Sequence, residues 1–234
     1  MAERMAQSDG FDLRVIRTTV LESTVETLRS AILVGHFRPG ERLIEAELCT
    51  TIGISRASLR EALRRLEAER LVDIIPNRGP IIPVLRWDEA EQIFEVRRLL
   101  ESEAAALAAR NASDADHAKI RTALAAFENA VGQDDLGELI RATNAFYDAI
   151  MIAGGNQIIR EMLRGLNARI SFLRGRSMSL NDRARHSASE LKAMADAIET
   201  RDEALARQKA AAHIDAARAA AEIAFSEMNI ETTA

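Results

Sequence analysis

The feature that most constrains the fold is a change of sequence pattern near Arg86 and Trp87. Glycine, proline and β-branched residues are concentrated before this point, whereas residues 88–230 are rich in Ala, Leu, Arg and Glu that repeat with a helical period. No strand pattern interrupts this second part, so we expect an all-α bundle there. The expected helices cover about 88–110, 114–131, 136–153, 157–175, 181–200 and 203–228.

The part before the boundary has a different organisation, with three helices. Apolar residues recur at helical spacing from Leu21 to Gly35, and a second, short helix is expected around 46–52, ending at Gly53. Ser55 then stands where an N-cap would begin a third helix. A helix, a tight glycine turn and a helix are typical of a helix-turn-helix unit.

A β-hairpin is expected to complete this unit. The runs "VDII" and "IIPV" flank "PNRG", so two β-branched segments surround a turn. The predicted fold class is therefore mostly α, with a winged helix-turn-helix over residues 21–85 and an all-α domain over 88–230. Residues 1–20 hold no sustained periodicity and are expected to form a flexible arm.

Composition limits the classes of function. The 234 residues carry a formal net charge of −5, and residues 1–85 hold 12 basic and 12 acidic residues, so binding to nucleic acid requires a local basic patch. No apolar run is long enough for a membrane helix and the N-terminus lacks a secretory signal, so we expect a cytoplasmic protein with no membrane partner. The single cysteine, Cys49, cannot form an internal disulfide.

A local basic patch is found in the third helix, "ISRASLREALRRLEAERLV", which holds five arginines. Arg56, Arg60 and Arg64 step by four residues along one face, while a stripe of leucines faces the core. In helix-turn-helix proteins the first turns of such a helix enter the major groove, where arginine reads guanine and short hydroxyls bind phosphate. The residues expected at the DNA are Ser55, Arg56, Ala57, Ser58 and Arg60.

The tip of the hairpin is a second candidate for DNA contact. Arg78, next to Gly79, is placed to contact a phosphate or the minor groove. The alternative is an ordinary solvated hairpin tip.

These residues carry a resemblance to a known family. The motifs "G.F.PGERL", Glu45, "IGISR", "LREALRRLE" and "NRG" resemble the N-terminal domain of the GntR family of bacterial transcription regulators over about sixty residues. The resemblance implies a homodimer on a palindromic double-stranded DNA operator, with Arg56, Ser58, Arg60 and Gly79 at the DNA. Glu45, which belongs to the shared motifs, is also expected among the DNA-binding residues. Ala57 and Ser58 stand where many members have Thr and Pro, which affects the expected base preference.

The helical part is similar to the FCD-type effector domain of the FadR subfamily. The stretches that carry this similarity are "EVRRLLESEAAALAA", "NAFYDAIMIAGGN", "SELKAMADAIETRDEALA" and "AAAHI". The resemblance implies an effector pocket and, in many members, a divalent metal.

The usual metal is predicted to be absent from this chain. Carrying over the family's four ligand positions gives Thr143, Tyr147, Leu191 and His213, of which only His213 is a good ligand. Leucine cannot bind metal, and tyrosine must lose a proton that is normally held to about pH 10. A shifted site made by His186, Glu190 and His213 is the alternative. No other cofactor is expected.

The expected effector is a small carboxylate bound by Arg97, Thr143, Tyr147, Arg169 and His213. Arg97 and Arg169 lie on apolar stripes of their helices, and an inward arginine needs an anion or a dense set of hydrogen bonds. Arg97 also matches a family arginine that faces the pocket. The alternatives are an intrahelical Arg97–Glu101 pair, simple core hydroxyls at Thr143 and Tyr147, and a solvent-facing His213.

The function favoured by these patterns is a ligand-responsive transcription regulator, expected to be a repressor that acts as a dimer. An enzyme is not expected, because no nucleophile with a base and no intact set of metal ligands is found. The alternative function is a constitutive or metal-dependent DNA-binding regulator that does not respond to an organic acid.

Overall fold

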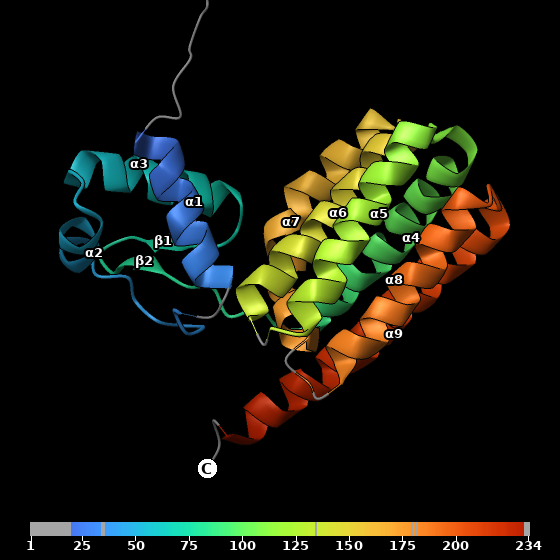
Figure 1. Ribbon diagram of the computed structural model, residues 1–234. Helices are drawn as coiled ribbons and strands as arrows, with labels where there is room; N and C mark the ends of the chain where they lie inside the picture. The colour runs from blue at the N-terminus through green and yellow to red at the C-terminus, as the bar shows by residue number, and fades with distance from the viewer. Residues whose placement is uncertain (1–19, 34–35, 134, 179, 181, 232–234) are drawn as a thin grey trace, which may run out of the picture.

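The computed structural model of the chain describes residues 20–33, 36–133, 135–178, 180 and 182–231. These residues form helices and one small two-stranded sheet. Figure 1 shows a small N-terminal domain, which holds the sheet, beside a larger bundle of long helices. The C-terminal end of the last helix extends beyond the bundle.

The N-terminal domain is built around a tight turn. Gly53 ends the second helix with φ 75°, a left-handed conformation in which a side chain would be strained, and its N–H donates to the Cys49 carbonyl. Ser55 follows as the N-cap of the third helix and accepts a hydrogen bond from the N–H of Ser58. The elements are α1 (Val20–Leu33), α2 (Glu45–Ile52), α3 (Arg56–Ala68), β1 (Asp73–Ile75) and β2 (Gly79–Ile81).

A compact apolar core fixes α3 in this domain. Leu59, Leu63 and Leu66 recur at helical spacing on α3 and are almost fully buried against α1 and the base of the hairpin. β1 and β2 pair antiparallel with Ile74 opposite Pro80. The arginine-bearing face of α3 is therefore turned away from the core.

The C-terminal domain is a helical bundle in which α4 packs along α9 and α5 packs along α6 and α8. Buried alanines on α4 and α9, such as Ala105 and Ala210, allow the two helices to approach closely. The capping box of Ser113 and Asp116 begins α5, and the Asp135 carboxylate caps α6. The elements are α4 (Trp87–Asn111), α5 (Asp114–Val131), α6 (Leu136–Gly154), α7 (Gln157–Met178), α8 (Arg183–Glu199) and α9 (Glu203–Glu231).

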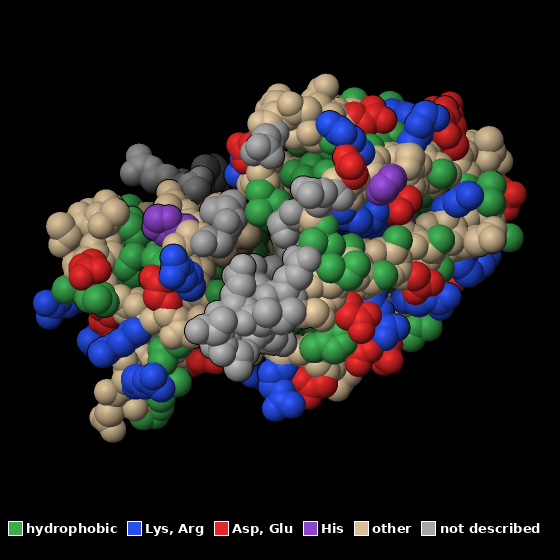
Figure 2. Space-filling view, turned by 90° about the horizontal axis from the view of Figure 1, so that it is seen from below, with side chains coloured by type: hydrophobic (Ala, Val, Ile, Leu, Met, Phe, Trp, Pro, Cys, Tyr) green, Lys and Arg blue, Asp and Glu red, His purple; other side chains and the backbone are tan. Residues whose placement is uncertain are grey.

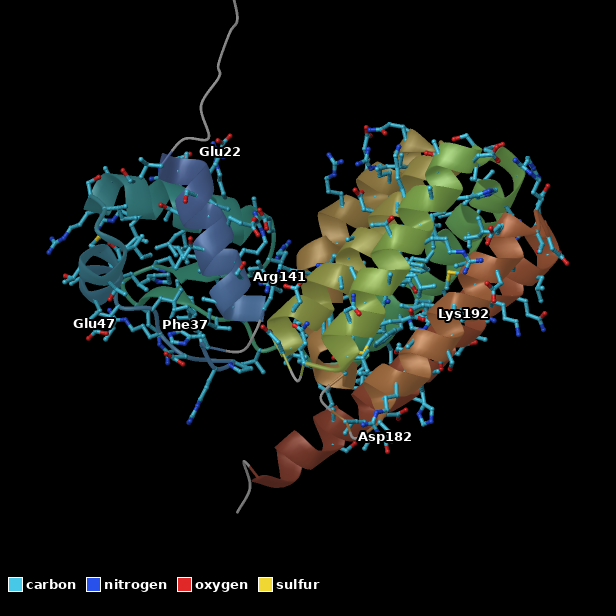
Figure 3. All side chains as sticks on the ribbon, in the orientation of Figure 1. Glu22, Phe37, Glu47, Arg141, Asp182 and Lys192 are labelled. Carbon is cyan, nitrogen blue, oxygen red and sulfur yellow. The ribbon has the colours of Figure 1, made fainter. Side chains whose placement is uncertain are left out.

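The two domains meet through α1 and α7. A Cβ built on Gly175 of α7 would lie 3.5 Å from the Leu33 carbonyl oxygen at the end of α1. Figure 3 labels Arg141 of α6 on the side of the bundle that faces the N-terminal domain. The bundle therefore touches the helix that packs directly behind α3.

The predicted fold class is confirmed. The six helices expected in the bundle are found within three residues of their expected ends, and the three helices and hairpin of the winged helix-turn-helix are present. The expected flexible arm at residues 1–20 lies, except for Val20 in α1, outside the described residues. No helix within the described ranges is long and apolar enough to cross a membrane.

Candidate functional site

The first turns of α3 form an exposed polar surface. Ser55, Arg56, Ala57 and Arg60 are exposed, and Ser58 is half-buried beside the cap. The structure therefore brings the residues expected to read DNA together on the outer side of the domain. A helix N-terminus also presents free backbone N–H groups, which suit phosphate oxygens.

Glu45 of α2 positions Arg60. The Nε of Arg60 donates to Oε2 of Glu45 at 2.9 Å, while the Arg60 side chain remains 63% exposed. A contact of this kind uses Nε and not the two terminal nitrogens, which are the atoms that arginine uses for bidentate contacts to guanine. The structure therefore places Glu45, which was expected among the DNA-binding residues, in contact with Arg60, and its part in DNA binding stays a prediction.

The hairpin tip adds a second basic point. Arg78 is exposed, and the flanking Asn77 and Gly79 have φ values of 62° and 85°, which close the turn. Arg42 lies beside this tip, because a Cβ on Gly79 would be 3.8 Å from the Arg42 guanidinium. Arg42 is exposed and forms an isolated β-bridge with Ile81, so the wing carries an arginine that sequence reasoning missed. Figure 2 shows Lys and Arg side chains together with Asp and Glu side chains on the N-terminal domain, at the left, and charges of both signs over the bundle as well.

The bundle contains a second candidate site, a cluster of buried and partly buried polar side chains from α4, α6, α7, α8 and α9. We call it the buried polar cluster. Its members are Arg97, Glu101, Tyr147, Arg174, Arg183, Glu190 and His213.

One half of the buried polar cluster is centred on Glu101 of α4. Arg97 donates through Nε to Glu101 Oε1 at 2.8 Å, and both side chains are at most 2% exposed. A terminal nitrogen of Arg174 on α7 lies 3.8 Å from the other Glu101 oxygen, and the Arg174 guanidinium lies over the Tyr147 ring, 4.5 Å from its centroid. The intrahelical Arg97–Glu101 pair, expected as an alternative, is present, but it is buried in the bundle.

Several polar atoms of this half find no hydrogen-bond partner among the described residues. They are both terminal nitrogens of Arg97, Oε2 of Glu101, the hydroxyl of Tyr147 and Nε of Arg174. Buried polar groups without partners are rare in native proteins, and each costs about 1–3 kcal/mol, or more when it is charged. The free atoms of Arg97 and Arg174 are all donors, so the site suits an acceptor group such as a carboxylate.

The other half of the buried polar cluster joins α8 to α9. Arg183 makes a two-point contact with Glu190 at 3.0 and 2.8 Å, and His213 Nδ1 lies 2.6 Å from Glu190 Oε2. The ring of His213 is 6.1 Å from the ring of Tyr147, which joins the two halves. His213 is 2% exposed, so it faces inward and not toward solvent.

Burial and the neighbouring charges determine the protonation states. Burial lowers the pKa of His213, against the opposing hydrogen bond to Glu190, so the ring is neutral at pH 7. Burial raises the pKa of Tyr147 far above its usual value, and the hydroxyl stays protonated. Burial also raises the pKa of Glu101, but Arg97 and Arg174 outweigh it and keep this carboxylate ionised. Burial lowers the pKa of Arg174 to about 10, at which it is still charged near neutrality.

A cavity of about 310 Å³ opens beside the cluster between α4, α6 and α7. Glu101, Tyr147 and Arg174 line it together with Asn144 and Asp148. Pockets for small ligands have volumes of roughly 300–1,000 Å³, so this cavity suits a small molecule.

Two residues expected at the effector site have other surroundings. The Thr143 hydroxyl donates to the Leu139 carbonyl at 2.7 Å, as a core hydroxyl would, so it needs no ligand. Arg169 is paired with Glu89 at 2.7 Å and lines a cavity of about 170 Å³ next to the N-terminal domain. Arg169 is therefore at the domain junction, whereas Arg174, about one turn and a half further along α7, lines the cavity of about 310 Å³.

The residues at the carried-over metal positions do not fit a metal ion. Thr143 is bonded to backbone, Tyr147 holds its proton, Leu191 is apolar and fully buried, and the Nδ1 of His213 is bonded to Glu190. His186 is exposed, so it does not join Glu190 and His213 in the alternative site. No group of three or more His, Cys, Asp or Glu side chains in the described part of the chain could hold a metal.

Comparisons with known proteins agree with this division into two parts. Residues 21–82 match the model "Bacterial regulatory proteins, gntR family", and residues 92–216 match the FCD domain model. The chain is 33% identical over 139 residues to the Nta operon transcriptional regulator of Aminobacter aminovorans, covering 59% of this chain and 66%, just under two thirds, of that protein. It is 29% identical over 208 residues to the galactonate operon transcriptional repressor of Escherichia coli, covering 80% and 90%.

Solved structures show the same fold. The structure of McbR from Escherichia coli aligns with a TM-score of 0.78 and 23% identity, covering 91% of this chain and all of that one. A putative GntR regulator from Rhodococcus sp. RHA1 aligns with a TM-score of 0.71 and 24% identity, covering 85% and 95%. The two relatives named above are transcription regulators. This chain belongs to the gntR family of bacterial regulatory proteins, and its helical bundle is an FCD domain.

Proposed function

We propose that this protein is a transcription regulator that binds a palindromic DNA operator as a dimer and that a small organic anion changes its affinity for DNA. The observation that carries the DNA-binding part is the exposed side chain of Arg60 on the first turns of α3, whose Nε is held by Glu45 of α2. Two copies of α3, one from each subunit, would enter successive major grooves about one helical turn apart. Repression, released by the anion, is the mode we propose.

The buried polar cluster supports the response to an anion. Arg174 lines the cavity of about 310 Å³, and its Nε is buried without a partner among the described residues, so a carboxylate in the cavity can accept a hydrogen bond from its guanidinium. A relative of this chain regulates a galactonate operon, and galactonate is itself a carboxylate. We propose that the anion binds without a divalent metal, because the donor set described above does not suit one.

The test is binding of the purified protein to its own promoter region, measured by fluorescence anisotropy over a series of salt concentrations. We expect sequence-selective binding whose affinity falls steeply with salt, since phosphate contacts release counterions. Arg60→Ala should weaken specific binding by about 1–3 kcal/mol, roughly 5- to 150-fold. The control is Arg65→Ala, another exposed arginine near the other end of α3.

Two results would contradict the proposal. One is salt-insensitive or sequence-independent binding by the wild type. The other is an equal loss of affinity in Arg60→Ala and Arg65→Ala, because the surface would then act only through its total charge.

A further inference from the structure

The wing is extended by a segment that comes from the chain before α2. Residues 40–43 run along β2, on the side opposite β1, and Arg42 forms the isolated β-bridge with Ile81 of β2. The residues directly before and after Arg42 are each joined to the β2 side by a backbone hydrogen bond of 2.9 Å. The backbone of Arg42 is therefore held to the wing from both sides.

The side chain of Arg42 lies on the outer face of this sheet. Leu43 is 2% exposed and faces the core, and side chains alternate along an extended segment, so Arg42 faces outward. Its guanidinium ends beside Gly79, where a Cβ would be 3.8 Å from Nε and from a terminal nitrogen. The adjacent Glu41 accepts a hydrogen bond from the Arg38 N–H at 2.7 Å. Arg42 has no ion pair or hydrogen-bond partner for its guanidinium among the residues that the structure describes.

Arg42 also lies between the two parts of the expected DNA surface. Gly79, beside its guanidinium, belongs to the wing, and Glu45, three residues further along the chain, contacts Arg60 of α3 at 2.9 Å. Three residues span at most about 10 Å, so Arg42 is close to both parts. When α3 enters the major groove and the wing reaches the adjacent groove, the DNA strand between the two grooves passes the segment that joins them. That strand presents phosphates to this segment.

We infer that Arg42 binds a phosphate of the DNA strand that separates the groove entered by α3 from the groove next to the wing. This inference rests on the proposed binding of DNA and adds a contact that sets the position of the wing. A guanidinium can donate two parallel hydrogen bonds to a phosphate. Because every nucleotide carries the same phosphate, the contact contributes affinity and not sequence preference.

The experiment compares the wild type with Arg42→Met on the promoter region and on an unrelated duplex of equal length, by fluorescence anisotropy. Methionine keeps part of the apolar stem next to Ile81 and removes the charge. Each phosphate contact contributes about 0.9 to the slope of log affinity against log salt, and a dimer loses two contacts. Arg42→Met should therefore reduce the slope by about 1.8 on both duplexes. Its loss of affinity should be about 12-fold greater at about 50 mM salt than at about 200 mM.

Two further variants separate a direct contact from a general effect of charge. Arg42→Lys keeps a positive charge and should keep the wild-type slope. Arg65→Met removes an exposed arginine near the other end of α3, one without an ion pair in the described ranges, and should also keep that slope. Arg60→Ala, in contrast, should lose more affinity for the promoter region than for the unrelated duplex. Melting curves followed by circular dichroism check that each variant is folded.

Three results would overturn the inference while leaving DNA binding standing. They are an unchanged slope in Arg42→Met, a loss confined to the promoter region, and an equal reduction of the slope in Arg65→Met. If Arg42→Met does not fold, Arg42→Gln, which keeps a polar end group, is measured in the same way. If the wild type itself binds DNA without dependence on salt, the proposed function fails and the inference fails with it.

Discussion

Removing the Arg97 side chain should destabilise the bundle strongly. The Arg97–Glu101 pair is 2.8 Å long and both side chains are at most 2% exposed, so Arg97→Met leaves a buried carboxylate without its nearest counter-ion. Loss of one partner of a buried pair costs about 3–5 kcal/mol. Arg174 stays 3.8 Å from Glu101, and the unpartnered nitrogens of Arg97 disappear with the mutation, so the lower end of this range, about 3 kcal/mol, is expected.

Arg98 provides a matched control for this change. It is the next residue on α4 and makes the same kind of contact, 3.0 Å from Nε to Asp215, but its side chain and that of its partner are 52% and 55% exposed. Exposed ion pairs contribute about 0–1 kcal/mol, because water and salt screen them. Arg98→Met should therefore cost less than about 1 kcal/mol.

The assay is denaturant and thermal unfolding, followed by circular dichroism, in a buffer free of organic acids. A loss of about 3 kcal/mol lowers the melting temperature of a domain of this size by roughly 6–12 °C. The double variant Arg97→Met with Glu101→Met should recover much of the loss, because apolar residues of similar size often replace a buried ion pair at little cost. Equal losses in Arg97→Met and Arg98→Met would refute the reasoning, since burial is the main difference between them.

Two further predictions concern His213 and the cap of α3. Because burial places the pKa of folded His213 below its unfolded value near 6.5, the unfolded chain binds more protons, and the free energy of unfolding should fall as pH drops below about 6.5. His213→Gln should flatten this fall between about pH 6.5 and 5. His186→Gln, which changes an exposed histidine, should leave the fall in place. A wild-type free energy of unfolding that stays level over this interval would contradict the lowered pKa of His213. Ser55→Ala removes the acceptor for the Ser58 N–H and should destabilise the N-terminal domain by about 0.5–2 kcal/mol. The measurement is urea unfolding, and Ser55→Thr, which keeps a hydroxyl, should show no loss. An unchanged unfolding midpoint in Ser55→Ala would speak against the cap.

The parts of the structure that sequence could predict are those set by local rules. Ser55 and Gly53 carry their own capping and turn chemistry, so the position of α3 followed from its neighbours alone. The inward side of α3 followed from the spacing of its leucines. The exposed position of Arg60 was predictable in the same way, although its contact with Glu45 on α2 depends on how two helices cross.

The buried polar cluster was harder to predict because it depends on packing between helices. An Arg and a Glu four residues apart usually form a solvated pair, and nothing local shows that α9 and α7 cover Arg97 and Glu101. Arg169 was predicted to face inward because it shares a helical stripe with Leu166 and Leu173, and the prediction did not include Arg174. Arg174 lies one turn after Ile170, which is buried, and this spacing was the feature of the sequence that could have indicated an inward Arg174. The inward direction of His213 came from family resemblance and not from periodicity.

The contact between α7 and α1 has a mechanical consequence. Arg174 lines the cavity of about 310 Å³, and the residue after it, Gly175, meets the end of α1. Neighbouring residues of a helix are separated by about 100° around its axis, so one rigid rotation displaces both. A turn of about 20° would shift the backbone, at a radius of about 2.3 Å, by about 0.8 Å. A ligand that rotates α7 would therefore move α1 and the reading helix packed on it in the same step, without a relay of side chains between them.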